Sequence, residues 1–122
     1  MSWHRIIYYF KDLKRNINGF FHRGKYGYAK YDLWNFDHYL AGMLGMALKE
    51  LAEKSNGWPS QYPEFPAFED YQNMLLKMAS GFTNYHENAF ENYDNEEEDQ
   101  RMRDNLSESL ELFKKYFGTL WD

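Results

Sequence analysis

Rings, cations and glycines are interleaved between His22 and Tyr31, and no other stretch of the chain suggests a definite chemistry. The stretch reads HRGKYGYAKY and leads into Asp32-Leu33-Trp34. Arginine and lysine bind phosphates, flat rings stack on bases, and glycine lets a backbone approach a ligand closely. A nucleotide requires all three. The predicted ligand-binding residues are Arg23, Lys25, Tyr26, Tyr28, Lys30, Trp34 and Asp37.

Each residue of this set has an expected role. The cations would hold phosphates, the rings would stack on a base, and Asp37 would accept hydrogen bonds from a base or a ribose. A structural interpretation stays open beside this one. In it the rings close one end of a helical bundle, and the cations hold its acidic helices.

Catalytic and metal-binding patterns find no support in the sequence. The chain has no cysteine, its serines lie in no nucleophile elbow, and HExxH is absent. The run Asp94–Asp99 lacks the glycine that a calcium loop needs at its sharp turn, and it resembles the solvated start of a helix. No two of the four histidines are spaced i, i+4. The sequence therefore predicts no enzyme, no metal and no cofactor.

Charge and composition narrow the possible partners. Residues 1–30 hold seven Lys/Arg and one acid, whereas residues 31–122 hold seven Lys/Arg and 18 acids. Such a mostly acidic surface repels phosphates, so duplex nucleic acid is not expected as a partner. Aromatic residues make up 20% of the chain, more than a core of this size needs, so some rings should lie at the surface, at an oligomer interface or in a pocket. We expect a homo-oligomer.

Two further expectations concern location. The N-terminus does not resemble a signal peptide, and no stretch approaches the roughly 20 apolar residues that a membrane-spanning helix requires. We therefore expect a cytoplasmic protein with no membrane partner.

Helical spacing dominates the first half of the chain. Apolar residues recur at helical intervals over Trp3–Ile17, and Asn18-Gly19 is predicted to stop that helix. Residues 19–31 are predicted to form a loop. Asp32 is the expected N-cap of a second helix, which Asn56-Gly57 closes. Two glycines inside that second helix suggest that another backbone or a ligand comes close there.

The second half continues in the same way. The proline-containing segment 58–66 is expected to be an ordered connector, followed by a helix over Phe68–Phe90, a turn at 92–95 and a last helix over Glu96–Phe117. The expected buried stripe of the last helix is Met102, Leu106, Leu110, Phe113 and Phe117. The fold predicted for residues 1–122 is a single all-α domain, a bundle of about four helices with an aromatic and basic loop between the first and the second.

Several strings of the sequence resemble a family of small, mostly uncharacterised tailed-phage and prophage proteins. The strings are Gly27-Tyr28 followed by DLWNFDHYLA at 32–41, NGWP at 56–59, the helix from Tyr71 to Gly81-Phe82, and LELFKKYF…LWD at 110–122. The resemblance implies a phage origin, and it brings no catalytic residue with it. It also implies a role against the host or its defences, since small phage proteins outside the virion often act there.

Two functions of different classes follow. The first is a phage-encoded, non-catalytic binding protein, a counter-defence sponge that sequesters a nucleotide-type immune signal in a pocket that two protomers could share. The alternative is an acidic inhibitor or adaptor that binds a host protein. The acidic C-terminal two-thirds and the excess of Tyr and Trp, residues enriched at interface hot spots, favour this alternative.

Overall fold

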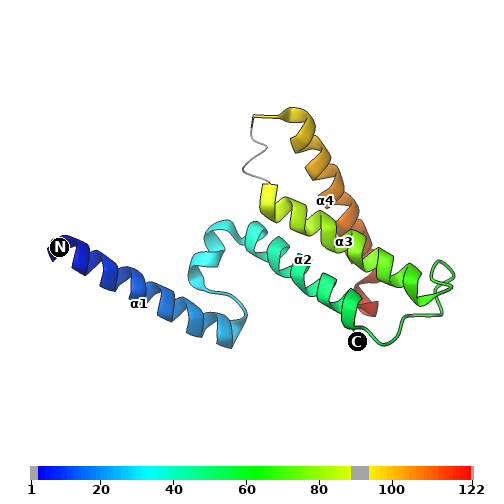
Figure 1. Cartoon of the computed structure of the whole chain (residues 1–122), viewed down its shortest axis with the longest axis horizontal. Helices are drawn as coiled ribbons and strands as arrows, with labels where there is room; N and C mark the ends of the chain where they lie inside the picture. The colour runs from blue at the N-terminus through cyan, green and yellow to red at the C-terminus, as the bar shows by residue number, and fades with distance from the viewer. Residues whose placement is uncertain (1–2, 89–93, 122) are drawn as a thin grey trace. The chain divides into compact units, whose positions relative to one another are not determined.

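The computed structural model describes residues 3–88 and 94–121 and confirms the all-α fold class (Figure 1). Its α-helices are α1 (Trp3–Tyr26), α2 (Phe36–Lys54), α3 (Phe68–Asn88) and α4 (Glu96–Tyr116). A 3-10 helix, η1 (Lys30–Asn35), lies between α1 and α2, and a second, η2 (Phe117–Thr119), follows α4. The chain forms two compact units, an N-terminal unit (Met1–Phe36) and a C-terminal unit (Asp37–Asp122).

The predicted end of the first helix at Asn18-Gly19 is wrong, because α1 continues for two further turns to Tyr26. Gly19 stays helical and is the buried residue of α1, and a Cβ at this position would overlap the ring of Tyr31. The glycine cap lies at Gly27 instead. Its φ is +87°, and its amide donates to the Arg23 carbonyl at 2.8 Å, which is a left-handed C-cap. Most of the predicted loop over 19–31 is therefore helix.

The predicted role of Asp32 as the N-cap of the second helix is also wrong. Asp32 lies inside η1, and α2 begins four residues later at Phe36. The Asp32 carboxylate accepts a hydrogen bond from the Ala29 amide at 2.7 Å, so it stabilises the turn before η1. Asp32 is a capping residue, as its side chain suggests, but for a different helix.

In the C-terminal unit, α2 packs on α3 through small residues. A Cβ at Gly45 would lie 3.1 Å from the backbone nitrogen of Thr83, and one at Gly42 would overlap the His86 ring. The close approach of another backbone, expected from glycines inside a helix, is confirmed. Gln72 adds a hydrogen bond from its side-chain amide to the Ala52 carbonyl at 2.8 Å.

Helices α3 and α4 lie side by side and share most of the core (Figure 1). The expected stripe of α4 is partly wrong: Met102 is buried, but Leu110 and Phe117 are exposed. Ser109 and Tyr116 are buried in their place. Gly81 on α3 leaves room for Ser109, which turns the adjacent Leu110 outward.

The core of the C-terminal unit also holds the connector and the end of α4. Phe65, from the proline-containing connector, packs on Tyr71 and Tyr116 with ring centroids 5.4 and 5.0 Å away. The buried Tyr71 hydroxyl donates to the Thr119 carbonyl at 2.7 Å. The connector is therefore ordered, as expected. The predicted third helix and following turn fall partly on residues 89–93, outside the described residues.

Candidate functional site

A cationic hollow of about 700 Å³ lies within the N-terminal unit, between one face of α1 and η1. Its lining residues are Lys11, Lys14, Arg15, Asn18, Gly19, His22, Lys30 and Tyr31. A second hollow of about 710 Å³ shares Arg15, Lys30 and Tyr31 with it and extends to Leu33 and Trp34. Pockets for small ligands commonly measure about 300–1,000 Å³, so the volume suits one.

The continuous helix α1 sets the positions of the cations. Residues spaced by three, four, seven or eight share one helical face, so Lys11, Lys14, Arg15, Asn18 and His22 line the hollow together. Arg15 pairs with Asp12 at 2.8 Å. Lys11, Lys14 and Lys30 have no carboxylate within ion-pair distance among the described residues. Three ammonium groups are thus available to an anion.

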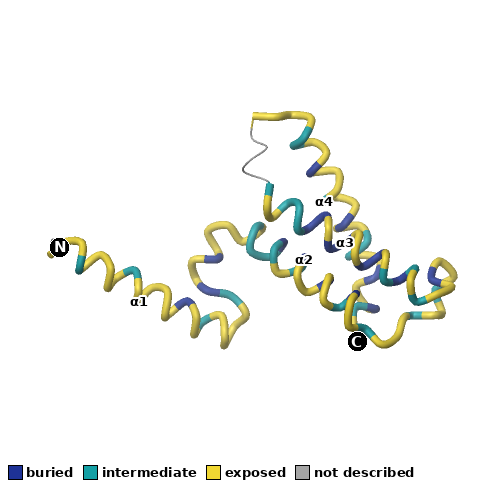
Figure 2. Tube along the Cα trace, viewed as in Figure 1, coloured by how far each residue is buried: buried dark blue, intermediate teal, exposed yellow. Residues whose placement is uncertain are grey.

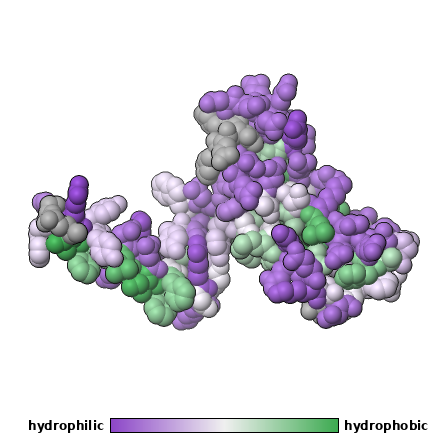
Figure 3. All heavy atoms as spheres, in the orientation of Figure 1, coloured by the Kyte–Doolittle hydropathy of each residue, from purple (hydrophilic) through white to green (hydrophobic). Residues whose placement is uncertain are grey.

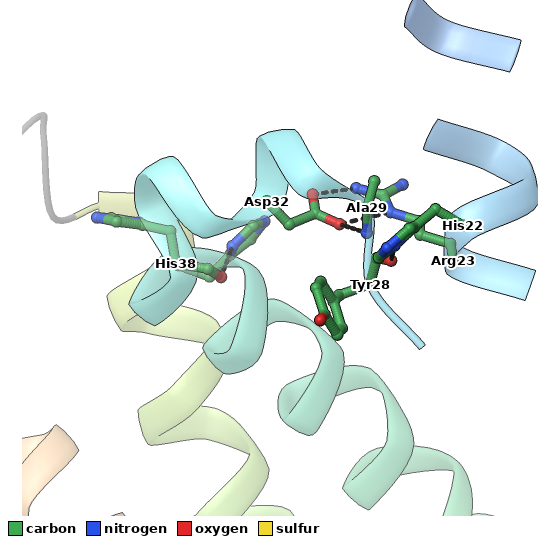
Figure 4. Close-up of polar contacts among 7 residues, drawn as sticks. His22, Arg23, Tyr28, Ala29, Asp32 and His38 are labelled. Carbon is green, nitrogen blue, oxygen red and sulfur yellow. Dashed lines mark hydrogen bonds and ion pairs between the residues drawn. The ribbon is translucent and has the colours of Figure 1, made fainter. Parts of the chain in front are cut away.

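A charged turn holds η1 against α1. Arg23 donates from Nε to Asp32 at 2.8 Å and from Nη2 to the other carboxylate oxygen at 2.5 Å (Figure 4). Asp32 is only 7% exposed, and the Arg23 hydrogen bonds hold the pKa of its carboxyl below the ordinary 3.8, against the opposing effect of burial. His22 hydrogen-bonds the Tyr28 carbonyl through Nδ1, which fastens the same turn one residue earlier.

The structure divides the predicted binding residues of the N-terminal unit into two groups. Lys30 and Trp34 line the hollows, and Trp34 is 89% exposed. The others belong to the surrounding frame: Arg23 binds Asp32, Tyr26 and Tyr28 pack on the His22 ring with centroids 4.6 and 4.9 Å away, and Lys25 lies over Tyr26. Whether any of them touches a ligand stays a prediction.

The seventh predicted residue, Asp37, belongs to the C-terminal unit and makes its contacts there. It accepts a hydrogen bond from the Tyr85 hydroxyl, and this bond lowers the pKa of Asp37 and raises that of Tyr85. The His38 ring stacks on Tyr85 at 5.0 Å, and His86 bonds the His38 carbonyl through Nδ1 at 2.7 Å. These contacts tie the start of α2 to the end of α3.

Seven lining residues of the first hollow escaped the sequence-based prediction. They are Lys11, Lys14, Arg15, Asn18, Gly19, His22 and Tyr31. The helix was expected to stop at Gly19, which placed His22 in a loop and separated it from Lys14 and Arg15. Extending the helical period of Lys11, Lys14, Arg15 and Asn18 through Gly19 would have brought His22 onto their face.

No family model, curated protein or solved structure matches this chain. The resemblance to small tailed-phage proteins therefore stays a prediction. Over residues 3–88 and 94–121, no three His, Asp or Glu side chains gather as a metal site. Within the same ranges, none of the helices has the length and apolar character needed to cross a bilayer.

Proposed function

We propose that the cationic hollow of the N-terminal unit binds a phosphate-bearing small molecule of nucleotide type and holds it without chemical change. The observation that carries this proposal is the set of Lys11, Lys14 and Lys30 around one hollow, with no carboxylate paired to them among the described residues. Ammonium groups bind phosphate oxygens with charge-assisted hydrogen bonds.

A ring for the base lies in the same hollow. Tyr31 packs by its edge against Gly19 and is 42% exposed, so part of the ring surface can accept a stacked base. Trp34 provides a second exposed ring on the adjoining hollow. With the phage origin that the sequence suggests, retention of such a ligand would serve a counter-defence sponge that sequesters a nucleotide signal.

The proposal is tested by isothermal titration calorimetry of the full chain at low salt. The ligands are pyrophosphate, ATP, cyclic di- and trinucleotides and cyclic ADP-ribose isomers. Each bound ligand is released by heat and weighed by mass spectrometry, since an unaltered mass means a sponge and an altered mass an enzyme. Calorimetry is preferable to thermal melting, because a ligand on the N-terminal unit need not stabilise the core of the other unit.

Two substitutions locate the site. Lys30→Glu should weaken binding at least about tenfold, because it removes a charge-assisted bond and adds repulsion. Lys49→Glu makes the same charge change on an exposed position of α2 and should alter the dissociation constant by no more than about twofold. Tyr31→Ala should weaken the binding of a base-containing ligand about tenfold and the binding of pyrophosphate far less. Tyr31→Phe, which keeps the ring, should leave both affinities unchanged. Absence of heat with every ligand of the panel overturns the proposal.

The acidic C-terminal unit favours the second candidate, binding of a basic host protein. This unit carries 17 Asp/Glu against seven Lys/Arg, and the first turn of α4 alone contains Glu96, Glu97, Glu98 and Asp99. Capture of one stoichiometric host protein, weakened by salt and unaffected by Lys30→Glu, would support it. Recovery of no such protein at low salt counts against it.

A further inference from the structure

An apolar face runs along α1 from Trp3 to Phe21 with little to cover it in the N-terminal unit. Its residues are Trp3, Ile6, Ile7, Phe10, Leu13, Ile17, Phe20 and Phe21. Trp3 is 72% and Phe10 62% exposed, and most of the helix is coloured as exposed in Figure 2. Figure 3 shows the apolar side chains as a green band along α1. Such an extended apolar stripe on a soluble protein marks an interaction surface.

Cations accompany this face. Helix α1 contains six Lys/Arg, namely Arg5, Lys11, Lys14, Arg15, Arg23 and Lys25. Its single carboxylate, Asp12, pairs with Arg15 at 2.8 Å. By helical position, Lys14 and Lys25 border the apolar face, whereas Arg15 lies on the opposite side. Arg23 in turn pairs with Asp32 of η1. A partner for this helix must therefore accept an apolar surface bordered by the lysines Lys14 and Lys25.

A second copy of the helix fits these charges poorly. The apolar residues include a seven-residue repeat, but the flanking positions of a coiled coil ordinarily carry opposite charges that pair across the interface. Here the flanking positions carry Lys14 and Arg23, with no acid of α1 at these positions to pair with a second copy, and Arg23 already pairs with Asp32. Ile7 and Phe21 also widen the face beyond a two-helix seam.

An anionic lipid surface satisfies both requirements at once. Interfacial helices combine a strongly amphipathic, Lys/Arg-bearing polar face with Trp, Phe and Leu on the other, and their apolar face enters the boundary between headgroups and acyl chains. Trp and Tyr favour that boundary. The 24 residues of α1 extend about 36 Å, long enough to lie flat across many headgroups.

We propose that α1 is a membrane-surface helix that binds anionic bilayers, with its apolar face in the lipid and its bordering lysines on the headgroups. This inference goes beyond the ligand-binding function proposed above and does not depend on it. It also replaces the expectation that the protein has no membrane partner, because that expectation considered only helices that cross the bilayer.

The test is co-sedimentation of the full chain with vesicles of phosphatidylcholine alone and of phosphatidylcholine with an equal amount of phosphatidylglycerol. The chain should bind the mixed vesicles at least about tenfold more tightly than the neutral ones, and added salt should weaken the binding. Phe10→Gln should weaken it at least about tenfold, since a buried ring is lost from the lipid phase.

Tyr8→Gln is the matched control. Tyr8 is 74% exposed and lies on the opposite side of α1, and the substitution likewise replaces a ring by an amide without a charge change. It should alter vesicle binding by no more than about twofold. Equal losses in the two variants would overturn the proposal, because binding would then not use the apolar face.

Two more results would also overturn it. One is the absence of binding to the mixed vesicles at low salt. The other is a dimer, seen by analytical ultracentrifugation without lipid, that Phe10→Gln disrupts while vesicle binding is unaffected; the face would then be an interface between copies. Lys30→Glu, which alters the hollow and not α1, separates this proposal from the ligand-binding one. It should weaken nucleotide binding at least about tenfold and leave most of the vesicle binding intact.

Discussion

At the scale of single residues, Asp32 connects two elements of the N-terminal unit. Its carboxylate receives two hydrogen bonds from Arg23 and one from the Ala29 amide, and so joins the end of α1 to η1. The hollow is lined by α1 on one side and by Lys30 and Tyr31 of η1 on the other. The turn held by Asp32 connects the two sides, because Lys30 and Tyr31 follow Ala29 directly. A change at Asp32 should therefore disturb the hollow without touching its lining.

We expect Asp32→Asn to destabilise this turn by about 1–2 kcal/mol, because a largely buried, charge-assisted pair is lost while Arg23 remains partly solvated. Hydrogen exchange of the Gly27 and Asp32 amides, both bonded within the turn, measures the effect. Asp12→Asn breaks an exposed pair on the same helix and should cost less than about 0.5 kcal/mol. Equal exchange in the two variants would contradict the role of Asp32.

The pH dependence of the turn follows from the same bonds. The pKa of Asp32 is lower in the folded turn than its ordinary value of 3.8, so the unfolded turn binds a proton more readily. The stabilisation by Asp32 is complete above about pH 3.8. It is lost as the pH falls through the lower pKa that Asp32 has in the folded turn. The hydrogen-exchange protection factor of the Gly27 amide should fall over that acidic pH range. In Asp32→Asn, the part of this fall that comes from protonation of Asp32 should be absent.

At the scale of elements, glycine decides how the helices of the C-terminal unit meet. Gly42 and Gly45 on α2 admit His86 and Thr83, and Gly81 on α3 admits Ser109 from α4. Each glycine costs up to about 1 kcal/mol of helix propensity relative to alanine. That cost is offset by the close packing of two backbones.

Gly81→Ala should therefore lower stability by about 1–3 kcal/mol, because the new methyl group would overlap the Ser109 hydroxyl and approach the Asn105 carbonyl at 2.7 Å. Chemical unfolding followed by circular dichroism measures the change. Adding Ser109→Ala should recover part of the loss. Gly24→Ala is the control, since a Cβ there meets nothing within 4 Å and the helix should gain from the alanine. A stabilised Gly81→Ala variant would show that α3 and α4 lie further apart.

At the scale of the whole molecule, the two units differ in net charge and in buried core. The N-terminal unit has seven Lys/Arg and two acids, and the C-terminal unit has a net charge of −10. Every residue of the buried apolar cluster belongs to the C-terminal unit, from Ala41 to Tyr116. The hollow that we propose as a binding site therefore belongs to a different unit from the buried apolar cluster.

A fragment of residues 37–122 should therefore fold alone and melt cooperatively, within about 5 °C of the full chain, because it keeps the complete core. A peptide of residues 1–36 should be only partly helical in water, since isolated helices need an external surface to cover their apolar face. Circular dichroism checks both. A fragment 37–122 without a cooperative transition would mean that the N-terminal unit contributes to the core.

The helices themselves were predictable from sequence alone, because helical periodicity and capping are local. Apolar spacing located α2, α3 and α4 to within a few residues. The structure adds that Asn95 caps α4, with its side chain accepting from the Glu98 amide at 3.1 Å. The charge asymmetry between the two ends was equally evident, because it depends on composition alone. Lys30 and Trp34 were chosen from residue type, and both line the hollows.

Contacts between distant residues decided the rest. Gly19 resembles a helix stop until Tyr31, twelve positions later, is seen to occupy the space of its missing side chain, and the face of α1 that lines the hollow exists only because the helix continues. Likewise, Ser109 is buried and Leu110 exposed because Gly81 leaves room on α3. A local sequence pattern indicates which residues prefer a helix. Contacts between residues far apart in the sequence determine where that helix ends and which of its faces is buried.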